Sequence, residues 1–255
     1  MNFTSVTELT GDDVTRQQVL SAFHRYNWAS SFCENKEILE VACGSGAGLG
    51  LLASKARRVH AGDVMAPLVD RVRSHYGSRV TVEVMDAEIL PFPSASLDVV
   101  IILEALYYVP NPEQFVSECR RVLRPGGFVL ITNSNKDMPD FNPSPYSRTY
   151  HGVVELGQLF GPDAFHTAFF GYWTYEEAPL WQRLLLPVKK AIVAMNLMPK
   201  TMQGKKLLKR LVFGGLVPMP VELKADMMPY VPPEQIASGV PDRRHRVVYS
   251  AAQLR

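Results

Sequence analysis

An alternation of short apolar runs with stretches of helical spacing constrains this chain most. Between residues 38 and 132, five runs have the length and composition of strands, and helical spacing or a tight turn separates most of them. The run Asp98–Leu103 is nearly all apolar and rich in β-branched residues, as in parallel strands that are covered on both faces. The pattern therefore predicts an α/β fold with a doubly wound, Rossmann-like sheet, whose ligands bind at the carboxyl ends of the strands. The five predicted strands are Ile38–Cys43, Arg58–Val64, Val80–Met85, Asp98–Leu103 and Phe128–Thr132.

Capping residues mark the starts of several predicted helices. A leading helix has Val19, Phe23 and Tyr26 on its apolar face, and we expect Asp12 or Asp13 to cap its first turn. A later helix begins at Asn111-Pro112, with Asn as the cap and Pro in the first turn. A short helix is predicted over 153–160.

The regular alternation ends near residue 133. Residues 174–220 contain two apolar helical stripes whose opposite faces are basic, which predicts a helical insertion. We expect this insertion to be a lid over the ligand site at the carboxyl edge of the sheet, with peripheral membrane contact through its basic faces as a further option. The sheet should then be seven-stranded and mostly parallel, with 246–251 as its last strand. The predicted division is 1–35 (N-terminal helical segment), 36–173 (Rossmann-like core), 174–220 (helical lid) and 221–255 (closing strands).

The bulk composition excludes several classes of protein. The formal net charge is only +2, which is too small to indicate a nucleic-acid partner by itself. Three cysteines without Cys-x-x-Cys spacing argue against a disulfide framework or a zinc site. No run reaches the roughly 18 apolar residues of a membrane span, so we expect a cytoplasmic protein.

The chemistry-bearing residues follow the predicted strands. Glu40 to Gly46 forms a small-residue turn, which lets the backbone approach a ligand closely. Asp63 lies about 20 residues past Gly44, where a carboxylate can accept the hydroxyls of a ribose. Asp86 ends the third strand and Glu104 the fourth. Together they predict a nucleotide-type cofactor at one edge of the sheet.

These segments resemble the class I S-adenosylmethionine (SAM) dependent methyltransferases, in particular the methyltransferase type 11 group. The similar segments are ILEVACGSG (38–46), AGDV (61–64), DAEILPFP (86–93), LDVVIILEALYYV (97–109) and RVLRPGGFVLIT (121–132). The resemblance implies a methyltransferase with SAM as cofactor and S-adenosyl-L-homocysteine as product, so 36–173 becomes the SAM-binding core. The implied cofactor-binding residues are Arg25, Glu40, Ala42, Gly44, Ser45, Gly46, Asp63, Val64, Met65, Asp86, Ala87, Glu88 and Glu104.

The resemblance also implies a role for each region. Glu40 and the turn glycines would line the methionine end of SAM, and Arg25 would reach its carboxylate. Asp63 would hold the ribose, Asp86 and its neighbour the adenine, and Glu104 would lie near the sulfonium. Position 40 departs from the family pattern, because Asp is usual there.

A hydroxyl acceptor would benefit from a general base, for which the sequence offers Tyr108 and His151 as catalytic candidates. Tyr108 stands where many relatives have His. His151 lies in the segment after the fifth strand, which in the similar family contributes to the acceptor pocket. His24 and His166 are further candidates.

Other functions fit the sequence less well. A nicotinamide-dependent dehydrogenase needs Gly-x-Gly-x-x-Gly at the turn, and only Gly48 to Ala53 fits a looser form, inside the predicted helix. A catalytically inactive SAM-binding protein stays open as an alternative. A metal-dependent methyltransferase needs clustered carboxylates after the fourth and fifth strands. The sequence offers only Glu104, Asn133 and Asp137 there, so no metal is expected.

The acceptor is the least determined part of the function. A base of a nucleic acid is disfavoured, because the fourth strand ends in Leu-Glu-Ala-Leu instead of an Asn/Asp-Pro-Pro-aromatic turn. A small molecule or glycan is expected, with a sugar hydroxyl in surface-polysaccharide or secondary-metabolite biosynthesis as first choice. A polyketide, phenolic or lipid-like acceptor is the alternative.

Overall fold

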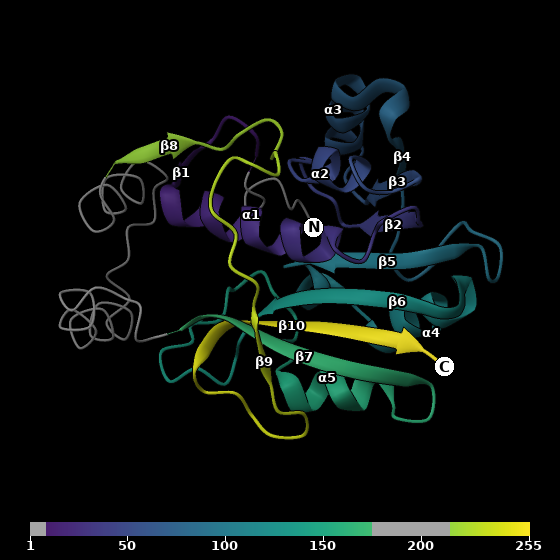
Figure 1. The fold of residues 1–255 in the computed structure, drawn as a ribbon, viewed down its shortest axis with the longest axis vertical. Helices are drawn as coiled ribbons and strands as arrows, with labels where there is room; N and C mark the ends of the chain where they lie inside the picture. The colour runs from purple at the N-terminus through teal and green to yellow at the C-terminus, as the bar shows by residue number, and fades with distance from the viewer. Residues whose placement is uncertain (1–8, 175–214) are drawn as a thin grey trace.

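The computed structural model describes residues 9–174 and 215–255, which form an eight-stranded sheet with helices on both faces (Figure 1). The strand order is β4-β3-β2-β5-β6-β10-β7-β9. The strands are β2 (Glu37–Val41), β3 (Arg58–Asp63), β4 (Thr81–Val84), β5 (Leu97–Leu103), β6 (Leu123–Ser134), β7 (Phe165–Thr174), β9 (Glu234–Ile236) and β10 (His245–Leu254).

The directions of the strands confirm the predicted α/β, mostly parallel sheet. β4, β3, β2, β5 and β6 are parallel, while β10 runs antiparallel between β6 and β7. Two features differ from expectation. The strand β7 lies before the predicted insertion, whereas the closing strands were expected after it. Its alternation of apolar and polar residues could not be recognised in the sequence, because aromatic residues occupy both of its faces. The short edge strand β9 adds an eighth strand to the predicted seven.

Within 9–174 and 215–255, five α-helices pack on the sheet and divide the core into two layers. Helices α1 (Arg16–Ser30), α2 (Leu49–Ala53) and α3 (Ala66–Tyr76) cover one face, while α4 (Pro112–Val122) and α5 (Val153–Phe160) cover the other. Along β5, Val99 and Ile101 contact the first layer, and Val100 and Ile102 contact the second. This alternation explains why β5 is apolar at every position from Val99 to Leu103.

The start of α1 corrects the predicted cap. Thr15 is the capping residue, since its Oγ1 accepts from the backbone N–H of Gln18 at 3.2 Å, and Gln18 Oε1 accepts from Thr15 N–H at 2.9 Å. Asp12 and Asp13 do not cap the helix, because α1 begins at Arg16 and Thr15 occupies the position directly before it. Asp13 instead begins β1 (Asp13–Thr15), which pairs with β8 (Leu216–Pro218). At α4 the predicted cap is confirmed, with Asn111 Oδ1 accepting from Gln114 N–H at 3.0 Å.

The predicted helical insertion, 174–220, falls almost wholly outside the described residues, and so do its two apolar stripes and basic faces. Its described end, 215–220, contains β8. Backbone hydrogen bonds of 2.8 Å join Met219 to Gly11 and to Asp12, which holds this segment against the start of the described chain. None of the helices in the described ranges is long and apolar enough to cross a membrane.

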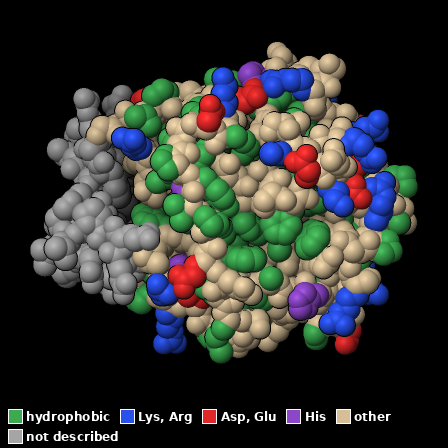
Figure 2. All heavy atoms as spheres, in the orientation of Figure 1, with side chains coloured by type: hydrophobic (Ala, Val, Ile, Leu, Met, Phe, Trp, Pro, Cys, Tyr) green, Lys and Arg blue, Asp and Glu red, His purple; other side chains and the backbone are tan. Residues whose placement is uncertain are grey.

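One face of the molecule shows hydrophobic side chains gathered in its middle, with charged groups toward the rim (Figure 2). Partly buried rings pack next to the buried core: Phe32 and Phe128 have centroids 5.3 Å apart, and Phe170 lies 6.2 Å from the buried Trp28. These contacts join α1 to β6 and β7.

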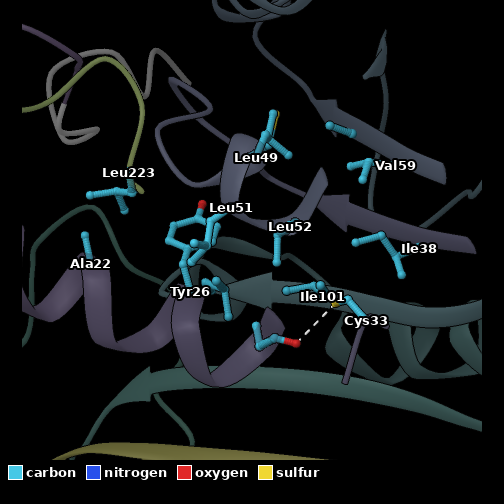
Figure 3. Packing of buried hydrophobic residues seen from close by; sticks show 14 of the residues in the cluster. Ala22, Tyr26, Cys33, Ile38, Leu49, Leu51, Leu52, Val59, Ile101 and Leu223 are labelled. Carbon is cyan, nitrogen blue, oxygen red and sulfur yellow. Dashed lines mark hydrogen bonds between the residues drawn. The ribbon is translucent and has the colours of Figure 1, made fainter. Parts of the chain in front are cut away.

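Tyr26 links α1 to α2 in the first layer. Figure 3 shows its ring extending from α1 toward Leu51 and Leu52 of α2. The ring lies against Gly48, where a Cβ atom would overlap the carbons of Tyr26. Gly48 has a φ of −98°, which any residue adopts, so only the space above it requires glycine.

We predict that Gly48→Ala lowers the free energy of unfolding by about 1–3 kcal/mol, because the added methyl group overpacks the contact with Tyr26. Urea denaturation measures the change. Gly157→Ala in α5 is the matched control, since its Cβ meets nothing closer than Phe169 Cζ at 3.9 Å. That variant should gain about 0.5–1 kcal/mol. Equal stability of the two variants would contradict this account of Gly48.

Candidate active site

The turn between β2 and α2 has a backbone that favours small residues. Ala42, Gly44 and Gly46 have φ values of 54°, 56° and 72°, in the left-handed region. The turn therefore brings backbone groups to the carboxyl edge of the sheet with little side-chain bulk above them.

Asp63 at the end of β3 ties this turn in place. Its Oδ2 accepts from Gly44 N–H at 2.9 Å, and its Oδ1 accepts from Met65 N–H at 2.9 Å. The residue is 7% exposed, and burial raises the pKa of its carboxyl group, although the two backbone hydrogen bonds act in the opposite direction. Each carboxylate oxygen keeps a further lone pair, so the group can still accept hydroxyl groups of a ligand.

A cavity of about 740 Å³ opens at this edge of the sheet. It brings together most of the residues predicted from the sequence. Those lining it are Arg25, Ala42, Gly44, Ser45, Asp63, Val64, Asp86, Ala87, Glu104 and Tyr108.

Four predicted cofactor residues do not line the cavity. Glu40 is buried beneath the turn, and an added Cβ on Gly46 would contact Val72. Met65 precedes α3 as its capping residue. Glu88 Oε1 accepts from the backbone N–H of Asn111 at 2.7 Å, so that side chain is directed to the start of α4.

Glu40 forms a buried pair with Tyr26, a residue that the sequence analysis placed only in the core. The Tyr26 hydroxyl donates to Glu40 Oε1 at 2.6 Å. Burial raises the pKa of Glu40 to about 8, against the lowering effects of Tyr26 and of the nearby Arg25.

Glu104 is held at the end of β5 in a left-handed conformation, with φ 54°. Its Oε2 accepts from the Ser134 hydroxyl at 2.8 Å and from the Tyr107 hydroxyl at 3.3 Å. These contacts fix the carboxylate in the wall of the cavity.

Aromatic side chains form the other half of the cavity. Tyr107 is the centre of this cluster, with its ring centroid 4.7 Å from those of Tyr108 and Tyr150. Phe141 lies 4.8 Å from Tyr150. Trp173 also lines this half, and the guanidinium of Arg246 lies 5.4 Å from its ring centroid.

Arg246 and Asp140 are an ion pair in the same wall. Two guanidinium nitrogens of Arg246 donate to Asp140 at 2.9 and 3.3 Å. The sequence analysis missed Asp140, Phe141, Trp173 and Arg246, because no motif connects them. The pair joins residues 106 positions apart, which only the placement of β10 brings together.

The histidine candidates lie away from the cavity lining. His151 is 7% exposed, and burial lowers its pKa. His24 stacks on Tyr172 at 4.6 Å, and its Nδ1 contacts the carbonyl oxygen of Val231 at 3.1 Å. His166 is exposed on β7. Of the predicted catalytic residues, Tyr108 alone lines the cavity.

The metal alternative gains no support from the geometry. Across 9–174 and 215–255, no three His, Cys, Asp or Glu residues are placed to hold a metal ion. Asn133 is fully buried, and Asp137 Oδ1 lies 3.1 Å from Lys136 Nζ. The dehydrogenase alternative also fails structurally, since Gly48 caps α2 and Ala53 ends it.

The fold and the cavity define a Rossmann-like α/β domain with a cofactor site at the carboxyl ends of its strands. Residues 39–131 match the family described as "Methyltransferase domain". Residues 39–131 are therefore similar to a methyltransferase domain, as the sequence resemblance indicated, and SAM is the cofactor that proteins of this kind use.

Similar proteins agree on the class. A probable S-adenosylmethionine-dependent methyltransferase of Mycolicibacterium smegmatis is 41% identical over 104 residues, covering 41% of this chain and 40% of that protein. A fatty-acid O-methyltransferase of the same species is 34% identical over 118 residues, covering 44% and 43%. The match thus spans about two fifths of the length of these relatives.

A solved structure extends the similarity of fold to most of the chain. The SAM-dependent methyltransferase from Thermotoga maritima, described as a possible histamine N-methyltransferase, has a TM-score of 0.59. The alignment covers 92% of this chain and 90% of that one at 12% identity. At that identity the comparison establishes the fold alone.

We predict that Glu40 makes stability depend on pH. Its folded pKa of about 8 exceeds the ordinary value of 4.5, so between these values the folded state holds a proton that the unfolded chain has lost. The free energy of unfolding should therefore fall as the pH rises through this window, by up to about 1.4 kcal/mol per pH unit. Glu40→Gln should flatten this dependence in urea denaturation series.

Glu113→Gln, an exposed residue of α4, is the control for the Glu40 series and should keep the wild-type profile. A Glu40→Gln profile that is parallel to the wild type would contradict the assignment of this dependence to Glu40.

Proposed function

We propose that the protein is a SAM-dependent methyltransferase that methylates an oxygen atom of a small apolar or aromatic acceptor. The observation that supports this proposal most is that one cavity is lined both by the polar glycine turn and by a cluster of aromatic rings. The glycine turn and Asp63 lie at one side, and the rings of Tyr107, Tyr108 and Tyr150 lie at the other. A cofactor and an acceptor can therefore meet in the same enclosure.

The cofactor half fits SAM in shape and charge. Asp63 offers two carboxylate oxygens to a ribose, and Asp86 lies beyond it along the sheet edge. Val64 is 50% exposed and gives the adenine an apolar surface next to Ala87. Four carboxylates and three guanidinium groups line the whole cavity, which suits a cofactor with a net positive charge.

SAM supplies an electrophilic methyl group on a sulfonium, so the protein has to align an acceptor about 3 Å from that methyl group and exclude water. Glu104 lines the cavity, and its bonds to Ser134 and Tyr107 hold it in one position. We propose that the carboxylate stabilises the positive cofactor on one side. The ring of Tyr108 orients the acceptor on the other.

The proton-accepting group is proposed to be Tyr108 or the acceptor itself. Tyr108 is half-buried and lies in the cavity wall beside Tyr107. His151 is less well placed for this role than the sequence indicated, since it is buried outside the cavity lining.

The lining favours an apolar acceptor over a free sugar. Five aromatic residues line the acceptor half and bury hydrophobic or ring-shaped groups well. The name of the fatty-acid O-methyltransferase that the chain is similar to agrees with this preference. We therefore place the phenolic, polyketide or lipid-like acceptor ahead of the sugar hydroxyl that the sequence analysis put first.

Binding of S-adenosylhomocysteine, measured by calorimetry, tests the function. The wild type should bind it, and Asp63→Ala should weaken binding by about 1–3 kcal/mol, because hydroxyl groups of the ligand lose their acceptor. Asp70→Ala is the control, since Asp70 is 73% exposed and pairs with Arg73 on the surface of α3. It should bind like the wild type.

Circular dichroism should show that both variants are folded. The absence of binding to the wild type would refute the proposed function. Unchanged affinity in a folded Asp63→Ala protein would refute only the role of this carboxylate.

A further inference from the structure

Two arginines of the acceptor half differ in their partners. Arg246 is neutralised by Asp140 through two short hydrogen bonds. Within the described part of the chain, the guanidinium of Arg148 forms no hydrogen bond and no ion pair, although the residue lines the same cavity. The acceptor half therefore presents one cation whose charge is not balanced by an adjacent carboxylate.

The loop that carries Arg148 is fixed on the aromatic wall. The backbone N–H of Arg148 donates to the carbonyl oxygen of Tyr107 at 2.8 Å. Two residues later, Tyr150 packs its ring against Tyr107 and Phe141. The hydroxyl groups of Ser147 and Tyr150 lie 2.9 Å apart. Because both sides of Arg148 are anchored, its backbone does not have to be ordered when a ligand binds.

The surroundings select the class of ligand. Apolar and aromatic surfaces next to a guanidinium match a molecule with an apolar body and an acidic group. A guanidinium binds a carboxylate through two parallel hydrogen bonds and cancels its single charge. A phosphate monoester near neutral pH would leave negative charge unbalanced, because the second arginine already has Asp140 as its partner.

We propose that Arg148 binds a carboxylate group of the acceptor, so that the substrate class is an aromatic or aliphatic carboxylic acid. This inference rests on the proposed methyltransferase function and makes its acceptor specific. Arg148 is a binding residue in this account, and the carboxylate holds the apolar body of the acceptor against Tyr107 and Tyr150.

Calorimetry with matched pairs of probes tests the inference at saturating S-adenosylhomocysteine. The pairs are phenylacetate with methyl phenylacetate and decanoate with methyl decanoate, since each ester keeps the apolar body, loses the negative charge and gains one methyl group. The carboxylates should bind the wild type about tenfold more tightly than their esters, as expected for a charge-assisted hydrogen bond. Phenyl phosphate is the third probe and should bind more weakly than phenylacetate.

Two variants assign the preference to the side chain. Arg148→Gln should remove the difference between acid and ester and leave the affinity for S-adenosylhomocysteine unchanged. Arg148→Lys should keep part of the difference in affinity between acid and ester. Arg120→Gln is the control, because Arg120 is exposed on α4 and does not line the cavity. It should behave like the wild type.

The outcomes separate the two proposals. Failure of S-adenosylhomocysteine to bind counts against the methyltransferase function itself. If it binds but no carboxylate binds up to millimolar concentration, or Arg148→Gln keeps the preference for acids, the inference about Arg148 is wrong. Tighter binding of phenyl phosphate than of phenylacetate would also overturn the assignment of a carboxylate.

Discussion

The carboxylate of Asp63 is the contact on which the cofactor side depends. It accepts backbone N–H groups from the glycine turn and from the residue before α3, so one side chain joins the ends of β2 and β3. Without such an acceptor, two amide groups near the cavity floor would lack a protein partner, and an unpaired buried amide is costly. The turn, the start of α3 and the floor of the cavity are therefore set together. A residue that binds a ligand here also maintains the local architecture.

Two further acids, one buried and one partly buried, lie near the cavity with hydroxyl groups as partners. Glu40 lies beneath the turn with the hydroxyl of Tyr26 as its partner, and Glu104 lies in the cavity wall with Ser134 and Tyr107. Burying carboxyl groups disfavours their charged form, which is why the pKa of Glu40 is high. A cationic ligand in the cavity would offset part of this cost. The same groups that destabilise an empty site would then favour a filled one.

The elements that could be predicted from the sequence are those whose structure depends on residues close by in the chain. The strand runs, the glycine turn and the Asn111 cap depend on neighbours within a few residues, and Asp63 is the last residue of its strand. The Thr15 cap was missed because β1 occupies the residues before α1, so that the helix begins beyond the aspartates. The partner of β1 lies about 200 residues away, which local sequence does not reveal. Arg246 and Asp140 are likewise far apart in the sequence, at 106 positions, and neither belongs to a motif. The orientation of His151 depends on how a loop packs on α5, which periodicity does not describe.

The position of β10 has a consequence for how the chain reaches its folded state. β10 lies between β6 and β7, although both of those strands precede it in the sequence. Until β10 arrives, the edge of β6 has no final neighbour, and β7 has no sheet to join. More than 100 residues separate the end of β6 from the start of β10. Closing so long a loop costs entropy before any contact forms, so this pairing is expected to form slowly. During that interval β6 is an open template for pairing with other chains, a period in which folding competes with aggregation.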